Sequence, residues 1–249
     1  MKKIIRRLIN FILNKINNSD VGLLNSSTRE DWIIKQIEML PKGSVLLDAG
    51  AGLMPYKKYC TKLIYKSQDF GEYSGSGDGL GLQKDTFDTS AIDIISDITS
   101  IPLENASVDT ILCSEVFEHI ADPVKALKEF NRLLSPGGKL ILTAPFNSIT
   151  HFSPHFYATG FSNNYYQHHL TESGFKIIEI ESNGNYFEYM AQELKRLPKV
   201  SKQNSSIKPN LVLEFSIRYL LRYLQRNSIN DNGSNQLLCF GYHVLAEKS

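Results

Sequence analysis

The strongest constraint on the fold is a series of short apolar segments that alternate with helical or loop-like segments. The first five of these segments are residues 44–49, 63–69, 92–97, 109–114 and 139–144. Such short runs, rich in branched residues, are typical of strands buried on both faces. Two later strand patterns lie at 175–181 and 238–247. Because strands that alternate with helices pair in parallel through right-handed crossovers, the sequence predicts a doubly wound α/β sheet of seven strands.

Helices are predicted where apolar residues recur at helical spacing. Between the fourth and fifth strands, one apolar stripe comprises Val124, Leu127, Phe130, Leu133 and Leu134. Pro136 and the following glycines should end this crossover helix. A second helix is expected at about 28–40, with Thr28 as its N-cap. Residues 71–90 are rich in glycine and have no helical stripe, so we expect a loop, either a functional lid or a disordered connection.

A helical insertion is predicted before the last strand, at about 183–237. It contains helical patterns near 186–197 and 211–226, joined by the polar segment 201–210. We therefore expect residues 28–249 to form one domain that carries this insertion, preceded by a helix and linker at 1–27.

Residues 1–18 form a basic amphipathic pattern. Its apolar positions are Ile5, Leu8, Ile9, Ile12 and Ile16. The segment is too short and too charged to span a bilayer, and no small-residue cleavage site follows it, so we expect a cytoplasmic protein. Two interpretations of the segment stay open: it lies in an anionic membrane interface, or it packs against its own domain or a second subunit. Arg218, Arg222 and Arg226 form a second basic stripe, either a headgroup-binding or a solvated face.

Composition narrows the class of partner and the compartment. The formal net charge is +1, so no global basic field favours nucleic acid. Cys60, Cys113 and Cys239 are widely spaced and odd in number, which fits a reducing compartment better than a disulfide framework. We interpret these cysteines as small buried apolar residues.

The chemistry-bearing residues follow the first three strands. The segment VLLDAGAG places Asp48, Gly50 and Gly52 where the first strand ends, Asp69 ends the second, and Asp97 ends the third. Strand ends of open α/β sheets form the ligand crevice, and glycine lets a ligand approach the backbone. A nicotinamide dinucleotide requires a third glycine in G-x-G-x-x-G, which is missing here. An acidic first strand end suits the ammonium group of a methionine moiety instead.

The segments LDAGAG, SQDF and 96–146 together resemble the class I S-adenosylmethionine (SAM)-dependent methyltransferases, over about residues 44–182. The resemblance implies a Rossmann-like sheet of order 3-2-1-4-5-7-6 with an antiparallel last strand. It also implies that Asp48, Gly50 and Gly52 surround the methionine part, that Asp69 holds the ribose, and that Asp97 meets the adenine. Ile98, Ser114 and Glu115 complete the expected cofactor-binding set. The run from TAPF to ATGFS resembles bacterial enzymes of cell-surface polysaccharide pathways.

The segment SEVFEHI contains a candidate metal site. Glu115, Glu118 and His119 would share one face of a short helix and could hold a divalent ion such as Mg²⁺. The pattern resembles metal-assisted O-methyltransferases, in which the ion lowers the pKa of an acceptor hydroxyl. The alternative is that Glu115 and His119 line the SAM pocket while Glu118 is solvated.

Histidines are the candidate catalytic residues. His151 and His155 follow the fifth strand and, with His119, could supply a general base, or they could simply pack a lid. The sequence predicts in-line O-methylation of a small-molecule or glycan acceptor. Two alternatives belong to other classes: a catalytically silent binding module, and a nicotinamide-dependent oxidoreductase.

Overall fold

The computed structural model describes residues 20–83, 86–207 and 210–249. The amphipathic segment predicted at 1–18 lies outside these residues. The chain divides into two compact units, which we describe separately. One comprises Ser27–Asn183 and Phe240–Ser249, and the other comprises the described part of residues 1–26 together with Gly184–Cys239.

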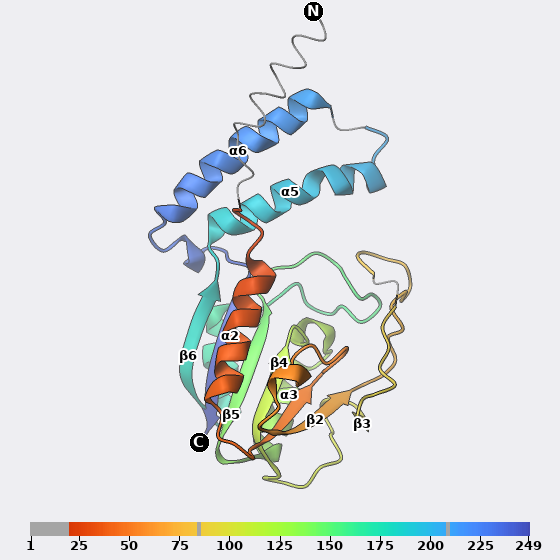
Figure 1. Cartoon of the computed structure of the whole chain (residues 1–249), viewed down its shortest axis with the longest axis vertical. Helices are drawn as coiled ribbons and strands as arrows, with labels where there is room; N and C mark the ends of the chain where they lie inside the picture. The colour runs from red at the N-terminus through yellow and green to blue at the C-terminus, as the bar shows by residue number, and fades with distance from the viewer. Residues whose placement is uncertain (1–19, 84–85, 208–209) are drawn as a thin grey trace, which may run out of the picture. The chain divides into compact units, whose positions relative to one another are not determined.

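The larger unit is built on one seven-stranded sheet with the order β3-β2-β1-β4-β5-β7-β6 (Figure 1). The strands are β1 (Val45–Ala49), β2 (Ile64–Asp69), β3 (Ile94–Ile95), β4 (Val108–Ser114), β5 (Leu134–Pro145), β6 (Phe175–Asn183) and β7 (Gly241–Lys248). All neighbouring pairs are parallel except those that β7 forms with β5 and β6. The structure confirms the predicted doubly wound α/β fold, including the strand order and the antiparallel last strand.

Helix α2 (Asn25–Met39) covers one face of this sheet. Trp32, Ile33 and Ile37 belong to one buried cluster with side chains from four strands. Those strand residues are Leu46, Leu112, Ile141 and Leu245. Each fully buried isoleucine contributes about 1.5–3 kcal/mol relative to an exposed one, so this apolar face rather than helix propensity holds α2 in place.

Helices α3 (Pro123–Leu133) and α4 (Asn163–Glu172) cover the opposite face. Tyr166 of α4 meets the ring of Tyr242 in β7, whereas Leu245, on the other side of the same strand, faces α2. Asp122 is the N-cap of helix α3, since its side chain accepts a hydrogen bond from the Lys125 N–H at 3.0 Å. It ends at Leu133, before the proline and glycines.

Two details differ from the sequence prediction. Helix α2 begins at Asn25, so Thr28 is not its N-cap; the Thr28 hydroxyl donates instead to Asn183 Oδ1. Strand β3, at the edge of the sheet, contains only Ile94–Ile95, so Asp97 follows the strand by two residues. Between β2 and β3, residues 71–90 form turns and bends, as expected; residues 84–85 lie outside the described part.

The smaller unit contains the helical insertion. Its helices are α5 (Tyr186–Asn204) and α6 (Leu211–Ile229), whose N-caps Asn185 and Asn210 accept hydrogen bonds from Glu188 N–H and Leu213 N–H. They pack through a small cluster formed by Val21, Ala191, Ile217 and Leu221. Helix α5 extends seven residues past the predicted end near 197, because Pro198 is accommodated inside it. Among the described residues, no helix has the length and hydropathy needed to cross a membrane.

Candidate functional site

The carboxyl ends of β1, β2 and β4 lie side by side at one edge of the sheet (Figure 1). The parallel register pairs Ala49 with Gln68, so the turn after β1 lies next to Asp69 at the end of β2. The Gly50 N–H donates to the Gln68 carbonyl at 2.9 Å, which ties that turn to β2. This edge is where open α/β sheets bind their ligands.

Asp69 holds the glycine turn through two hydrogen bonds with backbone N–H groups. One carboxylate oxygen accepts from the Gly52 N–H at 2.9 Å and the other accepts from the Gly71 N–H at 3.0 Å. The residue is buried, with 5% of its surface exposed. Because each carboxylate oxygen has two acceptor positions, both oxygens can still accept a further hydrogen bond from a ligand.

Asp48 is buried at the end of β1 and accepts a hydrogen bond from the Tyr65 hydroxyl at 2.7 Å. Burial raises the pKa of Asp48 from 3.8 to about 7, and the charge of Asp69 adds to that rise, while the Tyr65 hydrogen bond opposes it. An approaching cation would stabilise the ionised form. Asp48 is therefore suited to meet a positive ligand group rather than a phosphate.

The two glycines allow neighbouring side chains to pack directly against the backbone of the turn. Gly50 and Gly52 have φ angles of +73° and +51°, in the left-handed region. A Cβ at Gly50 would lie 2.6 Å from Val116 Cγ2, and one at Gly52 would lie 2.8 Å from Phe87 Cζ. The turn therefore requires glycine at both positions, and it touches the segments that follow β4 and precede β3.

The third carboxylate lies beyond β3. Asp97 is exposed, and its Oδ1 accepts from the Thr99 N–H at 2.8 Å. The neighbouring Ile98 is buried. Because β3 runs parallel to β2, this residue pair follows the same sheet edge as Asp48 and Asp69. Asp48 and Asp69 thus lie at the carboxyl ends of β1 and β2, and Asp97 lies just beyond the end of the neighbouring β3.

Beyond β4, the chain turns sharply at Glu115, whose φ is +55°. Ser114 Oγ lies 3.0 Å from Thr143 Oγ1 on β5. Glu115 accepts from Thr143 Oγ1 at 3.1 Å and from Arg29 Nη1 of α2 at 3.0 Å. The left-handed backbone at Glu115 places it outside the following turn, η2 (Phe117–His119), so it does not share a helical face with Glu118 and His119 as predicted.

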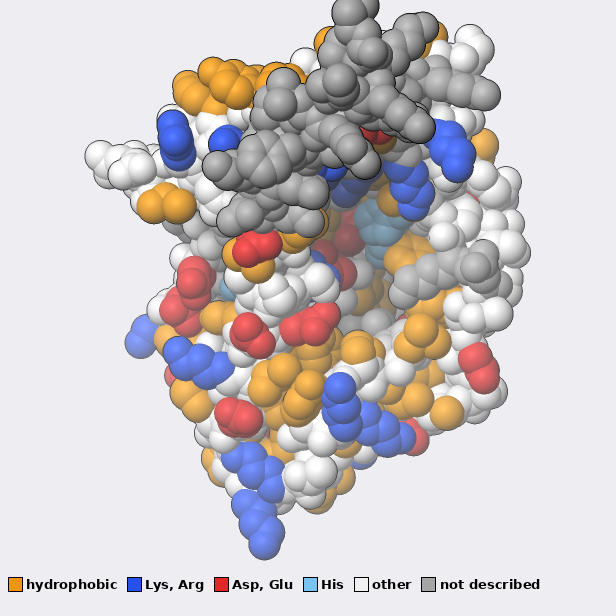
Figure 2. Space-filling model, turned by 45° about the horizontal axis from the view of Figure 1, so that its top comes forward, with side chains coloured by type: hydrophobic (Ala, Val, Ile, Leu, Met, Phe, Trp, Pro, Cys, Tyr) orange, Lys and Arg blue, Asp and Glu red, His pale blue; other side chains and the backbone are white. Residues whose placement is uncertain are grey.

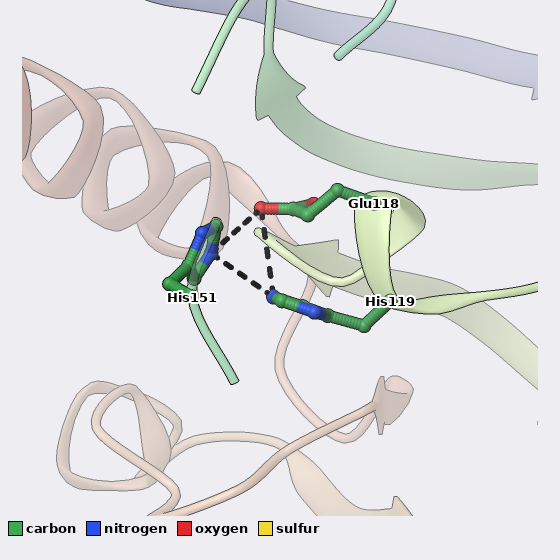
Figure 3. Close-up of side chains that lie close together, drawn as sticks. All are labelled: Glu118, His119 and His151. Carbon is green, nitrogen blue, oxygen red and sulfur yellow. Dashed lines mark hydrogen bonds and ion pairs between the residues drawn. The ribbon is translucent and has the colours of Figure 1, made fainter. Parts of the chain in front are cut away.

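Glu118 and His119 of η2 converge instead with His151, which lies in the loop after β5 (Figure 3). The Nε2 atoms of His119 and His151 lie 3.1 Å apart. Glu118 Oε1 lies 3.8 Å from His119 Nε2 and 3.6 Å from His151 Nε2. Glu118 is 1% exposed, so the expectation that it would be solvated is wrong.

Burial shifts the pKa values within this cluster. Burial lowers the pKa of His119 to about 4, so its imidazole is neutral at physiological pH. Burial also lowers the pKa of His151, but the nearby Glu118 carboxylate and the hydrogen bond to the Ile149 carbonyl outweigh that effect, and the net pKa is raised. Burial raises the pKa of Glu118. His151 is therefore the histidine of the pair that accepts a proton first.

Two loops surround the cluster. Leu82, in the glycine-rich loop, forms an isolated parallel bridge with His151, and its carbonyl accepts from the Phe152 N–H at 3.0 Å. The rings of Tyr73 and Phe87 each pack edge-on against Phe152, with centroids 4.6 and 5.7 Å from it. Figure 2 shows histidine side chains beside a hollow in which acidic side chains lie. The glycine-rich loop thus forms part of the wall around His151.

The other predicted histidine, His155, does not present its ring to the cluster. Its ring packs edge-on against Phe70, with centroids 4.9 Å apart, while its carbonyl oxygen lies 2.5 Å from His119 Nδ1. His155 therefore contributes its backbone to the cluster rather than its imidazole. His168 and His169 lie on α4, next to each other.

Comparisons with known proteins agree with this geometry. Residues 75–142 match the family model described as a methyltransferase domain. Over 156 residues the chain is 29% identical to a demethylmenaquinone methyltransferase of Chlamydia pneumoniae, which covers 60% of this chain and 66% of that enzyme. The chain spans between 16% and 66% of the length of the curated relatives it matches.

The structural comparison covers nearly the whole chain. A SAM-dependent methyltransferase of Archaeoglobus fulgidus superimposes with a TM-score of 0.53 at 18% identity, over 96% of this chain and 98% of that one. This chain has the class I methyltransferase fold. The domain match and the Chlamydia relative are both to methyltransferases. The [4+2]-cyclase SpnF shares the methyltransferase fold, with a TM-score of 0.52 at 14% identity over 88% of this chain and 80% of its own, so the fold alone does not determine the reaction.

Sequence reasoning missed two parts of this region. Arg29 binds Glu115, but a basic residue in the first turn of a helix gives no indication of which distant carboxylate it meets. His243 of β7 is buried and stacks on Trp32, with ring centroids 5.1 Å apart, and burial lowers its pKa to about 4. The alternation of β7 could have placed His243 on the α2 face, beside Leu245.

Proposed function

We propose that this protein is a SAM-dependent methyltransferase that transfers a methyl group to a hydroxyl of a small-molecule or glycan acceptor. The observation that carries the proposal is the arrangement of Asp48, Asp69 and the glycine turn at adjacent strand ends of a methyltransferase fold. A cytoplasmic enzyme of a cell-surface polysaccharide pathway is the setting that the sequence resemblance favours.

In this proposal the donor lies along the edge of the sheet. The ammonium of its methionine part meets Asp48, and the left-handed turn at Gly50 and Gly52 lets the methionine part approach the backbone. Asp69 accepts hydrogen bonds from the ribose hydroxyls while it holds the Gly52 N–H. Asp97 and the apolar Ile98 meet the adenine, and Ser114 and Glu115 close the pocket after β4.

The acceptor binds next to the histidine cluster. The cluster adjoins the donor turn on two sides, because Val116 contacts Gly50 and because Phe87, which contacts Gly52, packs on Phe152 beside His151. Methyl transfer is an in-line displacement at an activated carbon, so the protein mainly aligns donor and acceptor. A hydroxyl acceptor must also lose its proton, and His151, paired with Glu118, is placed to take part in that step.

Calorimetric titration with S-adenosylhomocysteine tests the donor site. We expect Asp69→Asn to weaken binding at least tenfold, because the amide has only one acceptor oxygen for the ribose and the two backbone N–H groups. Asp109→Asn is the matched control: Asp109 Oδ2 also accepts a backbone N–H, that of Val45 at 2.8 Å, but at the other end of β1. Undiminished binding by Asp69→Asn, or no binding by the wild type, would refute the donor site.

Transfer of labelled methyl groups tests the reaction. Wild-type protein incubated with labelled SAM and cell-envelope extracts should label a hydroxyl-bearing product, identified by mass spectrometry. A catalytically silent module would bind S-adenosylhomocysteine but label nothing. A nicotinamide oxidoreductase would instead change the fluorescence of a bound reduced cofactor, although the missing third glycine argues against it.

A membrane-presented acceptor, such as a lipid-linked saccharide, is the version of this proposal that the basic segments favour. Helix α6 exposes both apolar and basic side chains, among them Val212, Tyr219 and Arg226. The protein should therefore float with anionic liposomes, and deleting residues 1–18 should reduce that flotation. Equal flotation with and without residues 1–18 would remove this version and leave a soluble acceptor.

A further inference from the structure

We infer that Glu118, His119 and His151 form a binding site for a divalent first-row transition metal such as Zn²⁺. The site itself follows from the geometry of these side chains, whereas the role of the metal in presenting an acceptor rests on the proposed function. The three donors come from two segments separated in sequence and point toward one another (Figure 3).

Backbone carbonyls fix the tautomer of both histidines. His119 Nδ1 lies 2.5 Å from the His155 carbonyl, and His151 Nδ1 lies 2.9 Å from the Ile149 carbonyl. A carbonyl only accepts hydrogen bonds, so each Nδ1 carries the proton and each neutral ring offers an unprotonated Nε2. Metal-bound histidines are held in this way, with the other ring nitrogen donating to a carbonyl or carboxylate.

These two Nε2 atoms face each other at 3.1 Å, although neither neutral ring has a proton there to share. Two lone pairs at this separation repel each other unless a positive centre lies between them. Such a centre can be an additional proton on one ring or a metal ion. The geometry of the third group distinguishes these possibilities.

Glu118 Oε1 completes a triangle with the two nitrogens, with sides of 3.1, 3.6 and 3.8 Å. The centre of the circle through these three atoms lies about 2.0 Å from each of them. This distance is the length of zinc bonds to imidazole nitrogen and carboxylate oxygen. A hydrogen-bonded His–Glu pair would bring one nitrogen and one oxygen to about 2.8 Å. Neither histidine comes that close to Glu118, whereas both are placed for a common ion.

Glu118 has the features of a ligand rather than of an ordinary surface carboxylate. Its side chain is 1% exposed, and its Oε2 is buried without a hydrogen-bond partner among the described residues. Its backbone is also fixed, because the Glu118 carbonyl accepts from the Tyr157 N–H at 2.8 Å. A buried carboxylate with a free oxygen is costly unless a cation binds it.

The donor set determines the class of metal. Two imidazoles and one carboxylate suit Zn²⁺ and related first-row ions, whereas Mg²⁺ prefers oxygen ligands. The Mg²⁺ site expected from Glu115, Glu118 and His119 is therefore replaced by a different set. Glu115 is held by Arg29 and Thr143, and His151 takes its place.

Three protein ligands leave coordination positions for a substrate, as in catalytic zinc sites. Within the proposed function, an oxygen of the acceptor would occupy such a position, and the ion would supply Lewis acidity that lowers the pKa of that hydroxyl, so that its proton passes to solvent water. With the ion bound, His151 would act as a ligand instead of as the base. The rings of Phe152 and Phe156 pack around His119 and His151, so the site is shielded on its apolar side.

Metal titration tests this inference on full-length protein first treated with chelator. We expect calorimetry with Zn²⁺ to show one site per chain with a dissociation constant below about 1 μM, and His151→Ala to weaken binding at least 100-fold. Glu118→Gln, which keeps the side-chain volume, should weaken it at least tenfold. Co²⁺ should give visible d–d absorption in the wild type and lose it in both variants.

His168→Ala is the matched control, because His168 is an exposed histidine of α4 outside the cluster. It should bind Zn²⁺ as the wild type does. Titration of every variant with S-adenosylhomocysteine shows that it is folded and separates this inference from the proposed function. No stoichiometric Zn²⁺ binding by a wild type that binds S-adenosylhomocysteine would overturn the metal site alone and leave a proton-sharing histidine pair. Unchanged binding by His151→Ala and Glu118→Gln would overturn it as well.

Discussion

Replacing Asp48 by Asn should stabilise the protein, and the gain should increase with pH. Asp48 is buried, and burial raises its pKa from 3.8 to about 7. Its protonated form is therefore favoured in the folded state, so the stability it contributes is fully present below pH 4 and is lost as the pH rises to 7. Asparagine does not titrate, and its amide oxygen can still accept the hydrogen bond from Tyr65.

The magnitude follows from the separation of the two pKa values of Asp48. Each pH unit between 3.8 and about 7 corresponds to about 1.4 kcal/mol, so ionised Asp48 costs the folded state ~4 kcal/mol near neutral pH. At pH 5 only part of this cost is present, about 2 kcal/mol. The advantage of Asp48→Asn should therefore grow by roughly 2–3 kcal/mol between pH 5 and pH 8.

Urea denaturation of both proteins without ligand, at pH 5 and at pH 8, measures this difference. Asp109→Asn, which removes an exposed carboxylate, controls for the general effect of losing one negative charge. An advantage of Asp48→Asn that is equal at the two pH values would refute the reasoning. So would a variant less stable than the wild type at pH 8.

Three further predictions follow from the same edge of the sheet. If Asp48 meets the ligand ammonium, the affinity of the wild type for S-adenosylhomocysteine should rise between pH 6 and pH 8 as Asp48 ionises, and calorimetry should find this rise missing in Asp48→Asn. Gly50→Ala should reduce the free energy of unfolding by about 1–3 kcal/mol, because a Cβ would lie 2.6 Å from Val116 at a φ of +73°; stability close to that of the wild type in urea would show that the turn relaxes. Ile37→Ala, in the buried face of α2, should cost about 2–5 kcal/mol in the same assay without changing ligand affinity per folded molecule.

The fold could be predicted largely because its signals are local. The apolar runs around Leu46, Ile111 and Ile141 correspond to β1, β4 and β5, and the stripe through Leu127 and Phe130 corresponds to α3. Helix boundaries were less predictable, since a residue type that favours the N-cap also occurs inside helices. Thr28 lies inside α2, and its hydroxyl donates a hydrogen bond to Asn183 at the end of β6. Pro198 did not end α5, and its helix continues to Asn204.

The positions of site residues could be predicted where they lie at the end of a strand. They could not be predicted where contacts between distant segments determine them. Asp48 and Asp69 were placed correctly beside each other because parallel register follows from the strand pattern. The cluster around Glu118 was only half predicted. Helical spacing suggested Glu115 as a ligand, but its left-handed backbone removes it from that face. His151 reaches the cluster through the bridge between Leu82 and the loop after β5, a pairing that sequence spacing does not encode.

The position of β7 in the sheet has a consequence for synthesis on the ribosome. Strand β7 lies between β5 and β6, and both of these precede it in the chain. Their facing backbone groups stay unpaired until the ribosome has translated the whole helical segment Gly184–Cys239 and then Gly241–Lys248. The nascent chain therefore exposes two open strand edges throughout that interval, which makes it a candidate for chaperone binding before release.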